Sequence, residues 1–430
     1  MQDKKTAKTL LDITAENIKK IKDSEIISVE DSLGRIISED IIPKNEVPPF
    51  IRSAVDGFAV ISSDFLEKKI NKFRVENQIT AGYSKEIKPL NSGEAAFVTT
   101  GAPTPPNADS VVLIEEVEEY AGGYMIYKNK VEKGSYISPI GDDIKAGEVL
   151  FKKGHRIRFC DIAALSGIGM SSVSVYKKPL VGILSGGNEL TAPGEKLKKN
   201  RIYDINTTVL KSLVKDAGGV PEVIGAVEDD FEKITQTLKE ADESSKYDLI
   251  ISTGGTGASF LVLENKEIKN FYDLVPSAIE KTGKLLFHGV KLVPGKPTSF
   301  GMLNNGTPIF ALAGWPYSVL ITFDLFVRPA VQRMSNYKDL YKRYPSVKAA
   351  LKNDIIKEEG VRKYFQVKLT KSGDFLYAEI ISASKPPSAA RSLSPMIKAD
   401  GSFVMEEHIT NLKAGCFIDV TLNDYEIEYQ

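Results

Sequence analysis

Short apolar runs alternate with helical patterns between residues 179 and 334. The runs PLVGIL, PEVIGAV, DLIIST and PIFALAG are apolar at nearly every position. Helical patterns lie among them over residues 205 to 217, around 271 to 282 and from about 316 to 334. Strands buried on both faces that alternate with helices are typical of a mainly parallel sheet covered on two sides. The pattern therefore predicts an α/β domain in this part of the chain.

The flanking regions show the two-residue alternation of β-strands instead. From about residue 46 to 143 one strand pattern follows another, and Ala121-Gly122-Gly123 is predicted to be the turn of a hairpin. Residues 24–45 and 144–177 resemble two halves of one small module that this β-rich excursion interrupts. Residues 346–430 again predict short strands, which suit a small barrel or sandwich.

The simplest interpretation is a chain of four parts, with no low-complexity tract and no repeat of fixed period. We expect the boundaries to be 24–45 with 144–177 for the small linking module, 46–143 for the β-rich domain, 1–23 with 178–336 for the α/β domain and 337–430 for the last domain.

Charge and composition exclude several classes of protein. The 56 lysines and arginines nearly cancel the 57 aspartates and glutamates, so nothing points to nucleic acid or to an acidic membrane surface. The first residues lack an apolar stretch and no run could span a bilayer, so we expect a cytoplasmic protein. Cys160 and Cys416 lack the spacing of a metal site or a disulfide framework and are expected to be buried thiols. His155, His288 and His408 have no nearby partner at ligand spacing.

Three loops of the α/β domain carry the strongest functional signal. They are SGGNEL at 185–190, STGGTG at 252–257 and AGWPYS at 313–318, each directly after an apolar run. Ligands of parallel sheets bind beyond the carboxyl ends of the strands, and glycine turns there expose backbone N–H groups to an oxyanion. The alternative for each loop is a merely tight turn. The dinucleotide-binding pattern G-x-G-x-x-G is not matched, because Phe260 stands where its last position requires glycine or alanine. The chain also contains no P-loop motif.

Charged residues near these loops suggest phosphate and metal binding. The segment PGKP at 294–297 holds Lys296 between two prolines. The carboxylates suited to Mg²⁺ are Asp56, Asp143, Glu189, Asp229 and Asp230. Each has a structural alternative: PGKP as a surface β-turn, Asp56-Gly57 as a turn, and Asp229 and Asp230 as favourable charges at a helix N-terminus.

Eight separated blocks together resemble the MoeA/gephyrin-type molybdopterin molybdenumtransferases. They include PPFIRSAVDGFAV, TTGAPTPPNADSVVLIEEVE, IGDDIKAG, GILSGGNEL, DLIISTGG and FHGVKLVPGKPTSFG, in the family's order and over nearly the whole chain. The resemblance implies an L-shaped homodimer of four domains, with a MogA-like doubly wound, three-layer α/β domain and a C-terminal β-barrel. It also implies insertion of molybdenum from molybdate into adenylylated molybdopterin, with Mg²⁺ as cofactor and release of AMP. The active site would be shared between subunits, and a molybdopterin adenylyltransferase is a candidate partner.

The resemblance also assigns roles to individual positions. Asp56, Thr100, Asp143 and Glu189 would be catalytic, and Glu189 and Asp229 would bind the metal. The residues expected to bind the pterin pyrophosphate and molybdate are Ser185, Gly186, Gly254, Gly255, Thr256, Pro294, Gly295, Lys296, Pro297, Gly314, Pro316 and Ser318.

The chain departs from the family pattern in one half of this site. The glycine loop is usually followed by an aspartate, where this chain has Val262 and, nearest to it, the carboxylate of Glu264. Val293 and Gly289 stand where lysines are usual, although Lys291 and Lys296 could compensate in part. Other departures are Asn188 in place of an acid, and Ala313 and Trp315 in the last loop.

Two hypotheses of different kinds follow. The first is a molybdenumtransferase with an altered pocket, including a variant that favours tungstate. The second is a catalytically weak paralogue that binds molybdopterin-AMP or a partner protein as a carrier or scaffold. An unrelated phosphate-binding enzyme would require all of the block matches to be accidental.

Overall fold

The computed structural model describes residues 6–255, 260–264, 267–338, 345–381 and 393–423. Contacts within the chain separate two compact units. The first comprises Met1–Glu25, Gly34–Ile36 and Tyr176–Gln430, and the second comprises Ile26–Leu33 and Ile37–Val175. The four-part division is finer than these units and stays a prediction.

A six-stranded sheet forms the centre of the first unit, in the order β14-β11-β15-β21-β20-β18. Its strands are β11 (Leu180–Gly186), β14 (Val220–Val227), β15 (Leu249–Thr253), β18 (Gly283–His288), β20 (Ser299–Leu303) and β21 (Pro308–Leu312). The first four strands in the sheet order are parallel, whereas β20 and β18 run antiparallel to their neighbours. The predicted mainly parallel sheet is therefore confirmed.

Helices cover both faces of this sheet. They are α1 (Ala7–Asn17), α4 (Asn206–Asp216), α5 (Phe231–Glu243), α6 (Leu274–Thr282), α7 (Pro316–Thr322) and α8 (Arg328–Met334), with a π-helical segment at Phe323–Val327. Alternate residues of each strand enter different cores: Phe310 packs with α4, α7 and α8, while Ile309 packs with α5 and α6. Because successive side chains of a strand point to opposite faces, these two cores are separate layers. The doubly wound, three-layer architecture is thus confirmed.

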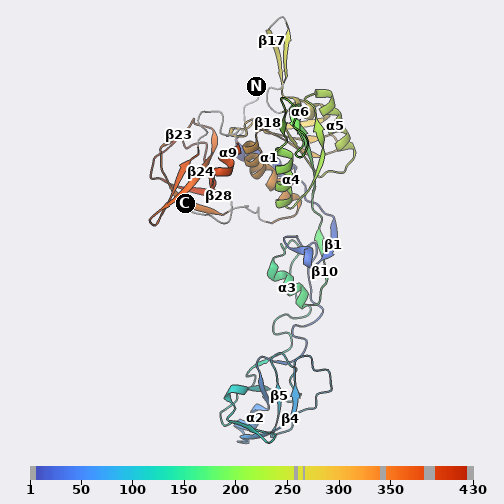
Figure 1. Cartoon of the computed structure of the whole chain (residues 1–430). Helices are drawn as coiled ribbons and strands as arrows, with labels where there is room; N and C mark the ends of the chain where they lie inside the picture. Colours follow the sequence, from blue (N-terminus) through green and yellow to red (C-terminus); the bar gives the residue numbers. More distant parts are fainter. Residues whose placement is uncertain (1–5, 256–259, 265–266, 339–344, 382–392, 424–430) are drawn as a thin grey trace. The chain divides into compact units, whose positions relative to one another are not determined.

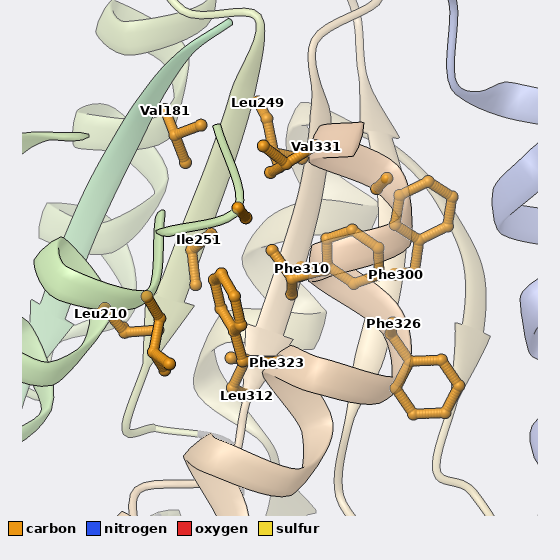
Figure 2. Close-up of a cluster of buried hydrophobic side chains, with 14 of the residues drawn as sticks. Val181, Leu210, Leu249, Ile251, Phe300, Phe310, Leu312, Phe323, Phe326 and Val331 are labelled. Carbon is orange, nitrogen blue, oxygen red and sulfur yellow. The ribbon is translucent and has the colours of Figure 1, made fainter. Parts of the chain in front are cut away.

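Aromatic residues fill the core on the α7 and α8 side. Figure 2 shows Phe300 and Phe310 from the sheet beside Phe323 and Phe326 from the π-helical segment. The rings of Phe300 and Phe310 have centroids 4.6 Å apart, and all four side chains are fully buried. Burial of one such side chain contributes about 1.5–3 kcal/mol. This core packs against the sheet and fixes the relative positions of the strands, whose carboxyl ends carry the glycine-containing loops.

A hairpin that the apolar pattern did not predict lies between β15 and α6. Its strands, β16 (Phe260–Glu264) and β17 (Glu267–Tyr272), are antiparallel, and they extend away from the sheet in Figure 1. The chain therefore leaves the sheet after Gly255 and returns at Asp273. Short apolar runs of this kind do not distinguish a strand from part of a helix.

The second unit holds a mixed six-stranded sheet in the order β6-β3-β5-β4-β8-β7. Its elements are β2 (Arg52–Ser53), β3 (Gly57–Val60), α2 (Ser62–Leu66), β4 (Lys72–Ile79), β5 (Glu94–Val98), β6 (Ser110–Leu113), β7 (Glu119–Ala121), β8 (Tyr124–Ile126) and β9 (Ile137–Ser138). Gly122 and Gly123 connect β7 to β8 with φ angles of 61° and 82°, so the predicted hairpin turn is confirmed. A smaller core around Ile37, Leu165 and Val175 gathers β1 (Ser24–Ser28), α3 (Phe159–Gly167) and β10 (Ser172–Tyr176).

The C-terminal region is a closed barrel rather than a sandwich. Its strands are β22 (Ser346–Leu351), β24 (Arg362–Ser372), β25 (Phe375–Ile380), β26 (Gly401–Met405) and β28 (Phe417–Leu422). They pair in the order β24-β25-β22-β28-β26, and β26 pairs again with β24. This pairing closes the ring and leaves no open edge among the five strands. The remaining short elements of the first unit are β12 (Leu190–Thr191), β13 (Ile202–Tyr203), β19 (Leu292–Val293), β23 (Ile355–Ile356), α9 (Leu393–Lys398) and β27 (Asn411–Leu412).

Two further expectations concern the cysteines and the presence of membrane-spanning segments. Cys160 and Cys416 are both exposed, so the prediction of buried thiols is wrong. Cys160 lies in α3, and Cys416 directly precedes β28. Within the described ranges, none of the helices has the length and apolar character that crossing a bilayer requires.

Candidate functional site

The carboxyl ends of four parallel strands form one rim of the α/β sheet. Ser185 lies beside Thr253, Thr253 lies beside Leu312, and Gly186 lies beside Val227. The loops that follow β11, β15, β21 and β14 therefore start from the same edge. The structure thus brings together the three glycine-containing loops, although Thr256 lies outside the described residues.

Main-chain segments approach one another closely at this rim. A Cβ atom on Gly254 would lie 2.2 Å from the carbonyl oxygen of Gly186, and Gly254 has a φ of 89°. A Cβ atom on Gly314 would lie 3.5 Å from the Cα atom of Gly254. Gly255 also has a positive φ, of 62°. An L-residue at 254 would clash and be strained, so glycine is required there for the loops to meet.

Asn206 joins two of these loops. It is the first residue of α4, and its Nδ2 donates to Thr253 Oγ1 at 3.1 Å and to the Gly314 carbonyl at 2.7 Å. Among the described residues, Asn206 Oδ1 and Ser185 Oγ are buried polar atoms without a hydrogen-bond partner. Buried polar groups are normally paired, so two unpaired ones at one rim are suited to a polar ligand. Asn206 was not predicted as a site residue, although the helix that it begins is one of the blocks that carry the family resemblance.

The PGKP segment lies at the same edge. Ser299, two residues after it, pairs with Ala311 on one side and with His288 on the other. Thr298 N–H and Oγ1 both donate to the Gly295 carbonyl, at 3.1 and 2.7 Å, and close the turn. Pro294 and Pro297 are half-buried, whereas Lys296 is exposed. The predicted lysine therefore stands on a rigid turn beside the glycine loops.

Two predicted metal ligands, Glu189 and Asp229, follow β11 and β14 at this rim. The Asp229 N–H donates to Asn188 Oδ1 at 3.2 Å, so Asn188 connects the two loops. A Cβ atom on Gly255 would lie 3.9 Å from Asp229 Oδ1, which places this carboxylate beside the glycine loop. Asp230 has another role: its side chain accepts from Lys233 N–H at 2.9 Å and caps α5, as its structural alternative proposed.

The described residues contain no group of three or more His, Cys, Asp or Glu side chains that could hold a metal ion. Glu189 is exposed and Asp229 is half-buried. Mg²⁺ is commonly held by one or two carboxylates together with phosphate oxygens of the substrate and water. The two carboxylates fit that kind of site, in which a bound phosphate completes the ligand set.

Neither of the two residues expected near the glycine loop lies beside it, whereas a later acid, Asp273, begins the segment that contacts the loop. Val262 belongs to β16, where it pairs with Asn270, and Glu264 is at the far end of the same strand. After the hairpin the chain returns at Asp273, which precedes α6, and Val275 N–H donates to the Gly255 carbonyl at 3.2 Å. The segment that begins at Asp273 is therefore hydrogen-bonded to the glycine loop.

Two of the histidines pair with aspartates. His288 Nε2 lies 2.9 Å from Asp273 Oδ2, and His155 Nε2 lies 2.7 Å from Asp161 Oδ2. Sequence spacing could not reveal these pairs. Among the other predicted positions, Pro316 is the first residue of α7 after the half-exposed Trp315.

Ser318 is almost fully buried in the first turn of α7. Its carbonyl oxygen accepts from Thr322 Oγ1 at 2.7 Å, within the same helix. Ala313, one of the departures from the family pattern, is also buried, whereas Val293 is 40% exposed at the base of the PGKP turn. In the last loop Gly314 and Trp315 are therefore exposed to solvent, whereas Ala313 and Ser318 are buried.

In the second unit, Asp56 and Thr100 form a direct contact. Thr100 donates to Asp56 Oδ1 through its backbone N–H at 2.6 Å and its hydroxyl at 2.9 Å. These two hydrogen bonds, the backbone one foremost, lower the pKa of the Asp56 carboxyl below its usual value. A Cβ atom on Gly57 would meet the Val112 carbonyl, so Asp56-Gly57 is held tightly against β6.

Asp143 is connected to this pair through an arginine that the motifs did not highlight. Arg52 Nη2 lies 3.4 Å from Asp143 Oδ2. Ser53, the next residue, accepts through its carbonyl from Gly101 N–H at 2.8 Å, directly after Thr100. Asp56, Thr100, Asp143 and Arg52 are thus neighbours on one exposed surface of the second unit.

One hollow of the first unit, of about 610 Å³, adjoins the carboxyl end of β14 and is lined by Val227 and Glu228 together with Glu232 and Lys233 of α5. A cavity of about 370 Å³ is lined by Asp248 and Pro308, which precede or begin β15 and β21, together with Lys19, Lys20 and Lys22. It therefore opens at the amino ends of the strands, at the opposite edge from the glycine loops.

Two family models match the chain. "MoeA N-terminal region (domain I and II)" matches residues 5–169, and "Probable molybdopterin binding domain" matches residues 182–333. The second match contains the rim, and the first contains Asp56, Thr100 and Asp143.

Relatives and solved structures are similar over most of the chain. A molybdopterin molybdenumtransferase of Bacillus subtilis is 34% identical over 317 residues, which cover 72% of this chain and 70% of the relative. The protein of the same name from Staphylococcus epidermidis is 30% identical over 93% of this chain and 91% of the relative. A crystal structure of a molybdopterin biosynthesis MoeA protein from Pyrococcus horikoshii has a TM-score of 0.79 at 32% identity, and covers 97% of this chain and 98% of that chain.

Proposed function

Because this chain belongs to the molybdopterin molybdenumtransferase family, we propose that it inserts molybdenum from molybdate into adenylylated molybdopterin and releases AMP. The family places the chain in molybdenum cofactor biosynthesis. The observation that carries the finer proposal is the rim, where three loops meet beside unpaired polar atoms. A pyrophosphate and a tetrahedral oxyanion both require several hydrogen-bond donors, and exposed backbone N–H groups supply them without a side chain in the way.

The rim residues have distinct proposed roles. Gly254 and Gly255 present the backbone to the phosphates, and Lys296 adds a compact positive charge from the PGKP turn. Asn206 holds the glycine loop and the Gly314 loop together. Ser185 Oγ, buried and without a protein partner among the described residues, donates to a bound oxygen atom. These groups bind and orient the substrate, so that the reacting anions lie close together.

Glu189 and Asp229 are the proposed ligands of Mg²⁺. Both are oxygen donors on adjacent loops at the rim. When bound there, the ion neutralises charge on the phosphates during transfer. Asp273 contacts His288 and is not proposed as a third ligand of the metal ion.

Asp56 and Thr100 are the proposed catalytic pair from a second copy of the chain. Thr100 keeps Asp56 ionised, because the hydrogen bonds favour the carboxylate. Arg52 and Asp143 lie on the same surface and offer one charge of each sign. We propose a homodimer in which this surface of one subunit faces the rim of the other.

The test is release of AMP from adenylylated molybdopterin in the presence of molybdate and Mg²⁺. The wild type should release AMP, and Asp56→Asn should be slower by about 10²-fold or more, as for loss of a catalytic carboxylate. Asp142→Asn, an exposed neighbour of Asp143, is the control and should keep the wild-type rate. If the wild type released no more AMP than Asp56→Asn, the transferase proposal would be wrong.

The same assay distinguishes the alternatives. Tight binding of the adenylylated pterin without AMP release would favour a carrier or scaffold. Faster release with tungstate than with molybdate would favour a tungstate-preferring variant.

A further inference from the structure

His288 connects two loops of the rim. It ends β18, and its two ring nitrogens contact Asp273 Oδ2 at 2.9 Å and Ser299 Oγ at 2.8 Å. Asp273 precedes α6, which is bonded to Gly255 through Val275 N–H. Ser299 follows the PGKP turn. One imidazole therefore bridges the glycine loop and the PGKP turn.

The hydrogen atoms of this network have two possible arrangements. An ionised carboxylate only accepts, so Nε2 donates to Asp273. Ser299 Oγ also lies 3.2 Å from the Pro297 carbonyl, but a serine has a single hydrogen to donate. If Ser299 donates to Pro297, Nδ1 must donate as well, and the ring carries a positive charge. If the ring is neutral, Ser299 donates to Nδ1 and the Pro297 carbonyl loses its hydrogen bond.

Among the side chains that the structure describes, few other charges lie near this group. On the packed elements, Lys284 of β18 and Glu280 and Lys281 of α6 lie near the ends remote from His288 and Asp273, while β20 has no charged residue. Lys291 and Lys296 lie on the connection from β18 to β20. Ser299 is fully buried, so water does not compete for its hydrogen bonds. Within the described part of the chain, Asp273 is thus the charged group in contact with the ring.

We infer that His288 is a positioning residue for anion binding at the rim. In its protonated form it neutralises Asp273, whose negative charge opposes a bound phosphate, and it directs the Ser299 hydroxyl to the Pro297 carbonyl, which holds the PGKP turn. The inference rests on the proposed anion-binding function of the rim.

The test measures the Kd of inorganic pyrophosphate by calorimetry at about pH 6 and about pH 8, the interval in which histidine changes charge. His288→Gln keeps a donor for Asp273 but cannot be charged. It should bind about fivefold more weakly than the wild type at the lower pH, with a ratio near one at the higher pH. Because the variant and the wild type are compared at the same pH, the protonation of pyrophosphate itself affects both Kd values equally.

Two further variants complete the design. His288→Lys carries a permanent charge and should bind at both pH values as tightly as the wild type does at the lower one. His155→Gln alters the other His–Asp pair, in the second unit, and should match the wild type throughout. Thermal unfolding checks that each variant folds. If His288→Gln does not fold, the Kd of His288→Lys is compared with that of the wild type at both pH values instead.

The outcomes separate this inference from the function on which it rests. Equal binding by wild type and His288→Gln at the lower pH, with the wild type still binding, overturns the role of His288 alone. Absence of pyrophosphate binding by the wild type at both pH values overturns both. Nitrogen NMR of the three histidine rings gives a second readout: pyrophosphate should increase the doubly protonated fraction of His288, and an unchanged signal in a protein that binds would overturn the inference.

Discussion

Asp56 shows how single contacts prepare a side chain for the proposed reaction. Its carboxylate is exposed, so burial contributes little to its properties. The backbone and hydroxyl of Thr100 lower its pKa by hydrogen bonding to the charged form. A carboxyl whose pKa is lowered on folding stabilises the protein at pH values above its pKa in the unfolded chain. This contribution to stability is lost as the pH falls through its pKa in the folded protein. Asp56 is therefore ionised throughout the neutral range.

Thr100→Val tests this contact at the residue scale. The substitution removes the hydroxyl donor at 2.9 Å and leaves the backbone N–H at 2.6 Å. The pKa of Asp56 should rise but stay below its ordinary value, because the larger of the two contributions remains. Carboxyl-carbon NMR titration measures it, with Thr104→Val as a control away from the carboxylate. An unchanged pKa in Thr100→Val would show that the hydroxyl does not act on Asp56.

The glycine loops are the elements on which the rim depends. Gly254→Ala should destabilise the α/β part by about 2 kcal/mol or more, because the new Cβ atom meets the Gly186 carbonyl at 2.2 Å and the residue has a positive φ. Gly225→Ala, in β14 with no atom within 4 Å of its Cβ position, is the matched control and should change stability little. Denaturant unfolding followed by the fluorescence of Trp315, the single tryptophan, measures both. Equal midpoints for Gly254→Ala and the wild type would contradict the close approach of the loops.

The same elements show what sequence patterns can and cannot predict. The apolar runs that end in glycine turns predicted the parallel strands and the common rim, because both depend on local pattern and strand direction. The inserted hairpin was not predicted, since its short apolar runs also suit a helix. The contacts of Asn206 with Gly314, and of His288 with Asp273, join residues whose proximity only the fold creates. Cys160 and Cys416 were expected to be buried from residue type alone, and exposure depends on the whole tertiary structure.

At the scale of the whole molecule, the proposal divides one active site between two copies. The rim belongs to the first compact unit, and the surface with Asp56 and Thr100 belongs to the second. Most soluble oligomers are symmetric dimers, in which such a division produces two equivalent sites. A monomer in sedimentation experiments at the concentration of the assay would contradict this arrangement.

Subunit complementation tests the central claim most directly. Asp56→Asn and Glu189→Gln alter opposite halves of the proposed site, so each variant alone should release little AMP. After the two are mixed and allowed to exchange subunits, about half of the dimers are mixed and one site of each mixed dimer is intact, which should restore about a quarter of the wild-type rate. A mixture that stays as inactive as its two components, despite demonstrated subunit exchange and an active wild type, would contradict a site built from the rim of one copy and the Asp56 surface of another.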